Sequence, residues 1–256
     1  MTLFGAAHFT ARCSAVVTFA VCSVGWATVA QGYLLPADYI VRILVEKRHQ
    51  LGVHDISVHL ATELDDQPHL IDERLYLKQP ERLRLVQQND VDHIHVQREE
   101  EVADGRENDL HRVTKPRADL FAALLMPKGR TIDERQGRLV ELIKRAGIDT
   151  AVVSLGRADK DTVYIIGANP GQPDVPQIWF DKATFMPVRY VLRQPGAGGT
   201  VRVETRLLDY GSDVAGNFPR VVENFIDHTR TRRAEVVRLQ VNKNLPETLF
   251  QIPQRN

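Results

Sequence analysis

The chain is poor in cysteine, in aromatic residues and in net charge. Its two cysteines, Cys13 and Cys22, both lie in the first thirty residues, and aromatic residues make up 7% of the 256. Basic and acidic residues balance, with 33 of each. A neutral chain offers no positive field for nucleic acid or for an anionic membrane surface. We therefore expect no nucleic-acid partner.

A long apolar run is also missing. The stretch "CSAVVTFAVCSVGW" (13–26) is too short to span a bilayer, follows Arg12 and precedes the small residues "ATVA" (27–30). This order is typical of a secretory signal. We predict a signal peptide at 1–30, cleaved after Ala30, and an exported, periplasmic single domain at 31–256; an uncleaved anchor is the alternative. That domain contains no cysteine and has to be stable without disulfides.

From Ile56 onward, apolar and polar residues alternate. In "ISVHLATEL" (56–64), Ile56, Val58 and Leu60 point one way, while Ser57 and His59 point the other. Such alternation is typical of antiparallel strands with one covered face. The same pattern recurs at 74–78, 82–85, 93–96, 201–207 and 236–241. Because turn-rich segments separate these runs, we predict about ten strands in meander order.

Three segments have helical signals. Residues 36–52 begin with a proline and end at Gly52, and their apolar residues have helical spacing. Residues 131–147 begin with Thr131 and Glu134, which form a capping box, and carry one apolar stripe. Residues 116–127 form a short apolar helix. The fold class is thus mainly β with α, in which the sheet either closes as a sandwich or curls around the helices.

Catalytic and metal signatures are weak. His93 and His95 share one strand face, but a third ligand from His54, His59 or His111 depends on strand pairing, and the predicted domain has no cysteine. No serine lies in a Gly-x-Ser-x-Gly elbow, and "PGAGG" lacks the Lys-Ser/Thr of a phosphate loop. We predict no metal, no cofactor and no enzymatic activity. An enzyme with scattered residues is the alternative. We interpret "RTRR" (230–233) as a hairpin turn.

Several stretches resemble one known family. "LYLKQPERLRL" (75–85), "VADGREN" (102–108), "IWFDKATFMPVRY" (178–190) and "VNKNLPETLFQIP" (241–253) are similar, in this order, to motifs of the LolA-like superfamily of exported lipoprotein and lipid carriers. The resemblance implies an unclosed antiparallel half-barrel over a helical lid, with an apolar cavity between them. It also implies a hairpin whose turn holds Asp181 and Lys182.

On this reading, large uncharged side chains line the cavity. The candidates are Leu60, Leu75, Leu77, Leu83, Leu85, Phe121, Leu124, Leu125, Trp179, Phe180, Met186 and Tyr190. Arg82 and Arg84 are candidates for a latch that holds the lid. The chain departs from the family where a glycine is expected, since Asp72 and Glu73 stand there.

Two functions follow from the resemblance. The first is a monomeric carrier that binds the acyl chains of a lipoprotein or a lipid and exchanges them with donor and acceptor proteins of the envelope. The second is a sensory module of the envelope that has the same fold, holds a signalling partner and has no transport role. A filled sandwich without a cavity is the third, simpler alternative.

Overall fold

The computed structural model describes residues 34–67, 69–79, 82–88, 93–98, 101–106, 109–113, 120–196, 198–211 and 218–252. All described residues belong to one compact unit within Leu34–Asn256. The predicted signal peptide lies outside the described residues.

The described residues form one antiparallel sheet of thirteen strands, in the order β6-β5-β4-β3-β2-β1-β13-β12-β11-β10-β9-β8-β7. The strands are β1 (Asp55–Leu64), β2 (Ile71–Lys78), β3 (Arg82–Gln88), β4 (His93–Arg98), β5 (Glu101–Arg106), β6 (Asp109–Val113), β7 (Val153–Ala158), β8 (Asp161–Ile166), β9 (Gln177–Asp181), β10 (Pro187–Gly196), β11 (Gly199–Tyr210), β12 (Pro219–Ile226) and β13 (Thr229–Val241). Two meanders, β1–β6 and β7–β13, therefore meet where β1 pairs with β13.

The thirteen strands exceed the expected count of about ten. The turn-rich segment "GRADKD" (156–161) is mostly strand, since it is divided between the end of β7 and the start of β8 and leaves a two-residue turn at 159–160. "RTRR" is likewise not a turn, since residues 230–233 lie inside β13. Its hairpin turns at Asp227 and His228, which have φ of 45° and 71°. Such left-handed pairs suit the tight turns of antiparallel hairpins.

The helices are α1 (Ala37–Gln50), α2 (Leu120–Leu125), α3 (Ile132–Arg145) and the 3₁₀ helix η2 (Glu247–Phe250). The three α-helices lie within the predicted helical segments, of which residues 116–119 lie outside the described residues. Thr131 caps α3 as expected, because its hydroxyl accepts a hydrogen bond from the backbone of Glu134 at 3.2 Å. The Glu134 carboxylate accepts from the backbone of Arg130, at 2.9 Å, rather than from that of Thr131.

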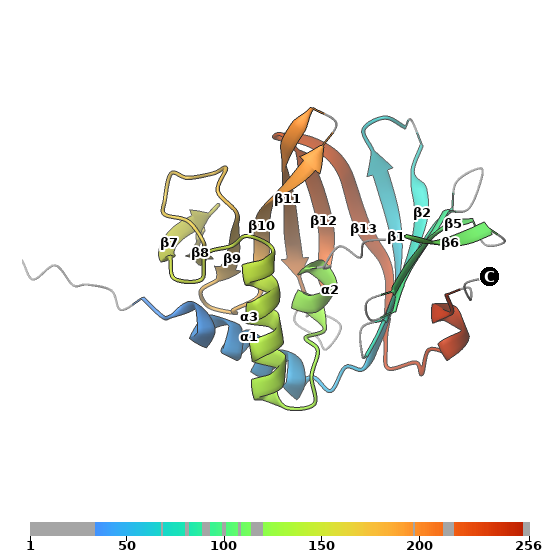
Figure 1. Cartoon of the computed structure of the whole chain (residues 1–256), viewed down its shortest axis with the longest axis horizontal. Helices are drawn as coiled ribbons and strands as arrows, with labels where there is room; N and C mark the ends of the chain where they lie inside the picture. Colours follow the sequence, from blue (N-terminus) through green and yellow to red (C-terminus); the bar gives the residue numbers. More distant parts are fainter. Residues whose placement is uncertain are drawn as a thin grey trace, which may run out of the picture. The chain divides into compact units, whose positions relative to one another are not determined.

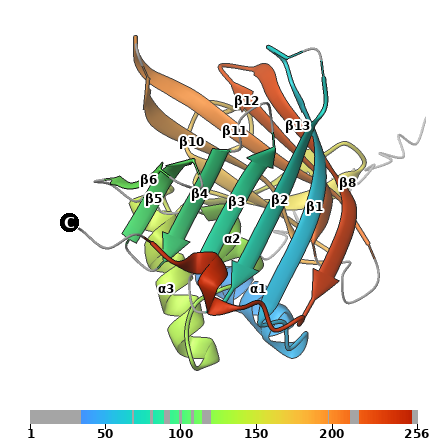
Figure 2. The same ribbon diagram turned by 90° about the vertical axis from the view of Figure 1, so that its right-hand side faces the viewer.

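The sheet is curved and unclosed, with β6 and β7 as its two edges. Helices α1, α2 and α3 lie on its concave side (Figure 1). The 3₁₀ helix η2 lies on the other face, in front of the strands in Figure 2, and contacts β3 and β4. The described residues are thus an α+β half-barrel whose concave face is covered by helices, and the predicted fold class is confirmed.

Candidate functional site

The concave face carries two apolar clusters. We call the first the helix cluster, because α1, α2 and α3 pack there against β8–β10. We call the second the β1–β3 cluster, because β1, β2 and β3 supply most of its buried residues. The short helix α2 belongs to both, since Leu120 and Leu124 are buried in the helix cluster and Leu125 in the β1–β3 cluster.

Phe121 joins the two clusters, because its ring packs against residues of each. Its ring also meets the ring of Phe218 edge to face, with 6.1 Å between the centroids. The six residues of α2 contain neither a charged nor a strongly polar side chain. The apolar side chains of α2 pack against the other helices on one side and against the concave face of the sheet on the other.

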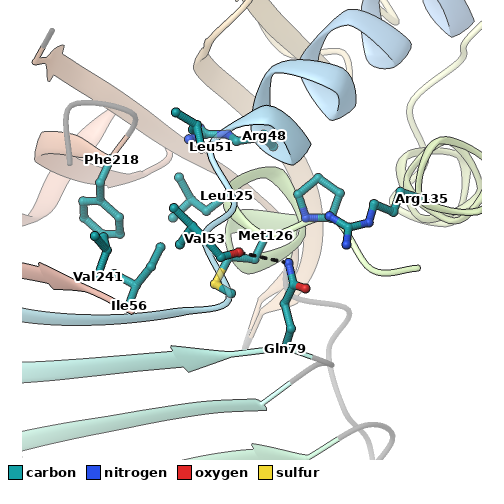
Figure 3. Close-up of a pocket in the computed structure, with 11 residues that line it drawn as sticks. Arg48, Leu51, Val53, Ile56, Gln79, Leu125, Met126, Arg135, Phe218 and Val241 are labelled. Atoms are coloured by element: carbon teal, nitrogen blue, oxygen red, sulfur yellow. Dashed lines mark hydrogen bonds between the residues drawn. The ribbon is translucent and has the colours of Figure 1, made fainter. Parts of the chain in front are cut away.

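A small pocket opens beside the C-terminal end of α2 (Figure 3). Its free volume is about 20 Å³, which suffices for a water molecule but not for an acyl chain. It is lined by Arg48, Leu51, Val53, Ile56, Gln79, Leu125, Met126, Pro127, Arg135, Phe218 and Val241. An acyl chain therefore does not fit in this pocket as it stands in the structure.

Arg48 is the buried cation of α1. It is 7% exposed and interacts with the hydroxyl of Tyr210, which in turn donates to the carbonyl of Pro187 at 2.7 Å. Burial lowers the pKa of the Arg48 guanidinium and raises the pKa of the Tyr210 phenol above its ordinary value. This pair ties α1 to β10 and β11. Arg48 was not among the predicted site residues, although it continues the buried stripe of Ala37, Val41 and Leu44.

The turn between α2 and α3 is held by Gly129 and Arg135. The Nε of Arg135 donates to the carbonyl of Gly129 at 2.8 Å. Gly129 has a φ of 145°, and a Cβ there would lie 2.7 Å from the backbone nitrogen of Arg135. Only glycine therefore permits this approach. The contact fixes the base of the Arg135 side chain at the rim of the pocket.

One end of the concave face is polar. Glu73 is fully buried, forms an ion pair with Arg232, and accepts hydrogen bonds from Thr62 and Gln87, each at 2.6 Å. Burial alone would raise the pKa of Glu73, but Arg232 and the two hydrogen bonds outweigh it and hold the pKa below its ordinary value. The sequence contained a signal, because Glu73 has the strand parity of Ile71 and Leu75.

The structure places eleven of the twelve predicted cavity residues in these two clusters. Leu124, Phe180, Met186 and Tyr190 lie in the helix cluster, Leu60, Leu75, Leu77, Leu83, Leu85 and Leu125 in the β1–β3 cluster, and Phe121 in both. Trp179 is the exception. It packs with Val163, Ile165 and Val188 in a third cluster, under the guanidinium of Arg189 at 4.5 Å. Neighbours along a strand face opposite ways, so Trp179 cannot share a wall with Phe180.

The two latch candidates contact the C-terminal segment rather than the α-helices. Arg82 forms an ion pair with Glu247 at 2.6 Å, and Arg84 donates to the carbonyl of Leu249 at 3.2 Å. Both residues flank the inward-pointing Leu83, so they project to the other face of β3. They hold η2 against that face.

The histidines do not assemble a metal site in the part of the chain that the structure describes, where no group of three or more His, Cys, Asp or Glu is arranged to hold an ion. His93 lies 2.9 Å from Asp104, and His95 lies 3.7 Å from the same carboxylate. Register pairs His95 with Leu85 of the β1–β3 cluster. Paired residues share a face, so these histidines lie on the concave side.

The fold and this site define a class: an unclosed antiparallel half-barrel that holds a short apolar helix against its concave face. A crystal structure of a LolA superfamily protein from Nitrosomonas europaea has this fold. It superposes with a TM-score of 0.51 at 10% sequence identity, over 85% of this chain and 98% of that one. At this identity the likeness concerns the fold alone. The resemblance to the LolA-like superfamily is thereby confirmed for the fold.

Two further solved structures are similar at TM-scores of 0.49. One is an outer membrane lipoprotein-sorting protein domain from Vibrio parahaemolyticus, with 10% identity over 84% of this chain and 97% of that one. The other is a DUF1329 family protein from Desulfovibrio piger, with 11% identity over 85% and 98%. No family model and no curated protein matches the sequence. Among the described residues, no helix is both long and apolar enough to cross a membrane.

Proposed function

We propose that this protein is an exported carrier that binds acyl chains between the concave sheet and the helices, and that α2 is its lid. The cargo is a lipid or an acylated lipoprotein. The predicted signal at 1–30 and the absence of cysteine from the rest of the chain fit an envelope protein. Neither a catalytic group nor a cofactor is required for this role.

The observation that supports the proposal most is the position of α2. This helix has six residues, and a helix so short depends on its contacts for stability. Its buried leucines, Leu120, Leu124 and Leu125, lie in the two clusters that form the concave face. When α2 moves away, the two clusters become one apolar wall.

The energies of the closed and loaded states are similar. Burial of a leucine side chain contributes about 1.5–3 kcal/mol, so the three leucines of α2 together contribute roughly 5–9 kcal/mol. A sixteen-carbon chain gains on the order of 10 kcal/mol at about 0.8 kcal/mol per methylene. Cargo therefore replaces α2 with little net change in free energy, which suits a protein that both loads and releases.

The proposed wall omits Trp179 and adds Phe218, which faces Phe121. It consists of Leu60, Leu75, Leu77, Leu83, Leu85, Phe180, Met186, Tyr190 and Phe218, while Phe121, Leu124 and Leu125 belong to the lid. The polar end at Glu73 bounds it on one side.

A cross-link tests the lid. In residues 31–256 of the Phe121→Cys/Phe218→Cys variant, the two introduced cysteines are the only ones, so a short thiol-specific reagent can join α2 to the sheet. We expect the cross-linked protein to lose uptake of a fluorescent fatty acid, and reduction of a cleavable cross-link to restore it. The two single-cysteine variants, treated alike, are the controls. Uptake by the cross-linked protein at the rate of the controls would refute the lid.

Native mass spectrometry of protein from an envelope fraction then identifies the cargo. A bound mass that extracts into solvent as an acylated molecule supports the carrier. A stable complex with one protein, which dissociates when lipid is added, would instead favour the sensory module.

A further inference from the structure

The pocket beside α2 has a charge pattern that an acyl chain does not need. Its eleven lining residues include two arginines, Arg48 and Arg135, and no acidic residue. The others are apolar apart from Gln79, whose amide donates to the carbonyl of Val53 at 3.3 Å. A mainly apolar pocket that also carries two arginines and no acidic residue matches an amphiphile with a negative head.

Arg135 is positioned to bind such a head. Its Nε is engaged with the carbonyl of Gly129, so the guanidinium plane is oriented before any ligand arrives. Figure 3 shows the side chain reaching from α3 toward the pocket. Among the described residues Arg135 has no ion-pair partner. Its two terminal nitrogens are the donors that arginine uses for bidentate bonds to a carboxylate or a phosphate.

Arg48 of α1 adds a second positive charge to the lining of the pocket. Its guanidinium is buried and bonded to the phenol of Tyr210, a group that carries no charge near neutral pH. An arginine keeps its proton in such surroundings. Its field is strong there because the medium is weakly polarisable.

The pocket also lies where a cargo head belongs. Leu125, Met126 and Pro127, at the end of α2, form part of its lining, so a chain that takes the place of α2 ends beside Arg135. We propose that the carrier selects amphiphiles with an apolar tail and an anionic carboxylate or phosphate head, and that Arg135 binds this head. The inference rests on the proposed carrier function and narrows its cargo to acidic lipids rather than neutral acylglycerol groups.

Three palmitoyl probes test the selection by displacement of a neutral fluorophore from the purified protein. Monopalmitoylglycerol is neutral, palmitoyl lysophosphatidate adds a phosphate to the same body, and palmitate supplies a carboxylate. One charge-assisted hydrogen bond changes binding about tenfold or more. We therefore expect at least one acidic probe to bind about tenfold more tightly than monopalmitoylglycerol, with a ratio that falls as salt is added. The acidic probe with the larger ratio identifies the head as phosphate or carboxylate.

Variants then locate the head. In Arg135→Gln the ratio should fall toward one, whereas Arg135→Lys, which keeps the charge, should retain part of it. Arg138→Gln is the matched control, because Arg138 lies on the same helix but is exposed and paired with Glu134 at 2.7 Å; its ratio should equal that of the wild type.

Equal affinity of the wild type for all three probes would overturn the selection while leaving the carrier intact. A preference that survives in Arg135→Gln would likewise overturn the assignment to Arg135. If no probe displaces the fluorophore, the proposed carrier function fails together with the selection.

Discussion

The ring of Phe121 meets the ring of Phe218 at 90°, with 6.1 Å between their centroids. This edge-to-face contact joins the N-terminal end of α2 to the residue that precedes β12. Aromatic pairs of this geometry contribute about 0.5–1.5 kcal/mol beyond the area that they bury. The closed state of the concave face therefore depends on a contact that single substitutions can remove.

Phe121→Ala should speed the uptake of a fluorescent fatty acid and lower the free energy of unfolding. Phe121 is half-buried, so we expect a loss of about 2 kcal/mol, below the roughly 3–5 kcal/mol of a fully buried phenylalanine. Stopped-flow uptake and urea unfolding measure the two effects. The control is Phe225→Ala, which removes a ring stacked under Arg206 at 4.3 Å, away from the lid. An uptake rate that is unchanged in Phe121→Ala would contradict the role of α2.

Trp179→Ala should leave uptake unchanged. The side chain lies in the third cluster and donates to Gln177 at 2.6 Å, so its loss costs stability, by about 2–3 kcal/mol for a half-buried ring. Trp179 is also the one tryptophan of residues 31–256. Its emission spectrum should therefore stay constant as cargo binds. A blue shift on binding would place Trp179 at the cargo site after all.

Tyr210 should make the protein sensitive to alkali. The pKa of its phenol is raised above the ordinary value of 10.0 in the folded state, so the folded protein holds this proton more tightly than the unfolded chain does. The contribution of Tyr210 to the free energy of unfolding is fully present below pH 10 and is lost as the pH rises from 10 through the higher, folded pKa. Tyr210→Phe should reduce this alkaline loss, although at neutral pH it costs about 1–3 kcal/mol through the lost hydrogen bonds. Unfolding in urea at pH 7 and above pH 10 measures both.

Glu73 should make the protein sensitive to acid. Its pKa in the folded state lies below the ordinary value of 4.5, so its contribution to stability is complete above about pH 4.5 and is lost as the pH falls through the lower, folded pKa. Glu73→Gln should weaken the protein by about 3 kcal/mol at neutral pH, as when one partner of a buried ion pair is removed, and should flatten the acid slope. The matched control is Glu63→Gln, an exposed partner of Arg230 at 3.5 Å, which should change stability by less than about 1 kcal/mol.

The alternation of apolar and polar residues in the sequence predicts most strands of the half-barrel. Ile56, Val58 and Leu60 are buried on one face of β1 as predicted, because a strand with one solvated face requires this alternation. The same rule predicts that Trp179 faces away from its neighbours Ile178 and Phe180. Trp179 and Phe180 were assigned to one cavity because both are aromatic, but neighbouring residues of a strand lie on opposite faces.

Other parts of the site depend on residues far apart in the sequence. Arg82 and Arg84 contact η2 about 165 positions later, and no local pattern predicts which segment covers the outer face of β3. The packing of α2 on the concave face is likewise not predictable from alternation, because alternation shows which face of a strand is apolar but not which segment packs against it. The contact of Arg135 with Gly129 depends on the positive φ of Gly129. A glycine in the sequence permits such a conformation but does not predict which side chain will approach it.

The pairing of β1 with β13 has a consequence for how the chain is made. In the register of these two strands Ile56 pairs with Val241, so synthesis of about 185 further residues separates the two central strands. Until β13 has been synthesised, β1 and β12 are unpaired edge strands, and such edges are prone to aggregation. Such distant pairing also slows folding. A nascent or truncated chain that lacks β13 therefore has two half-sheets that cannot pair with each other in the native order. The native sheet forms only after β13 has been added.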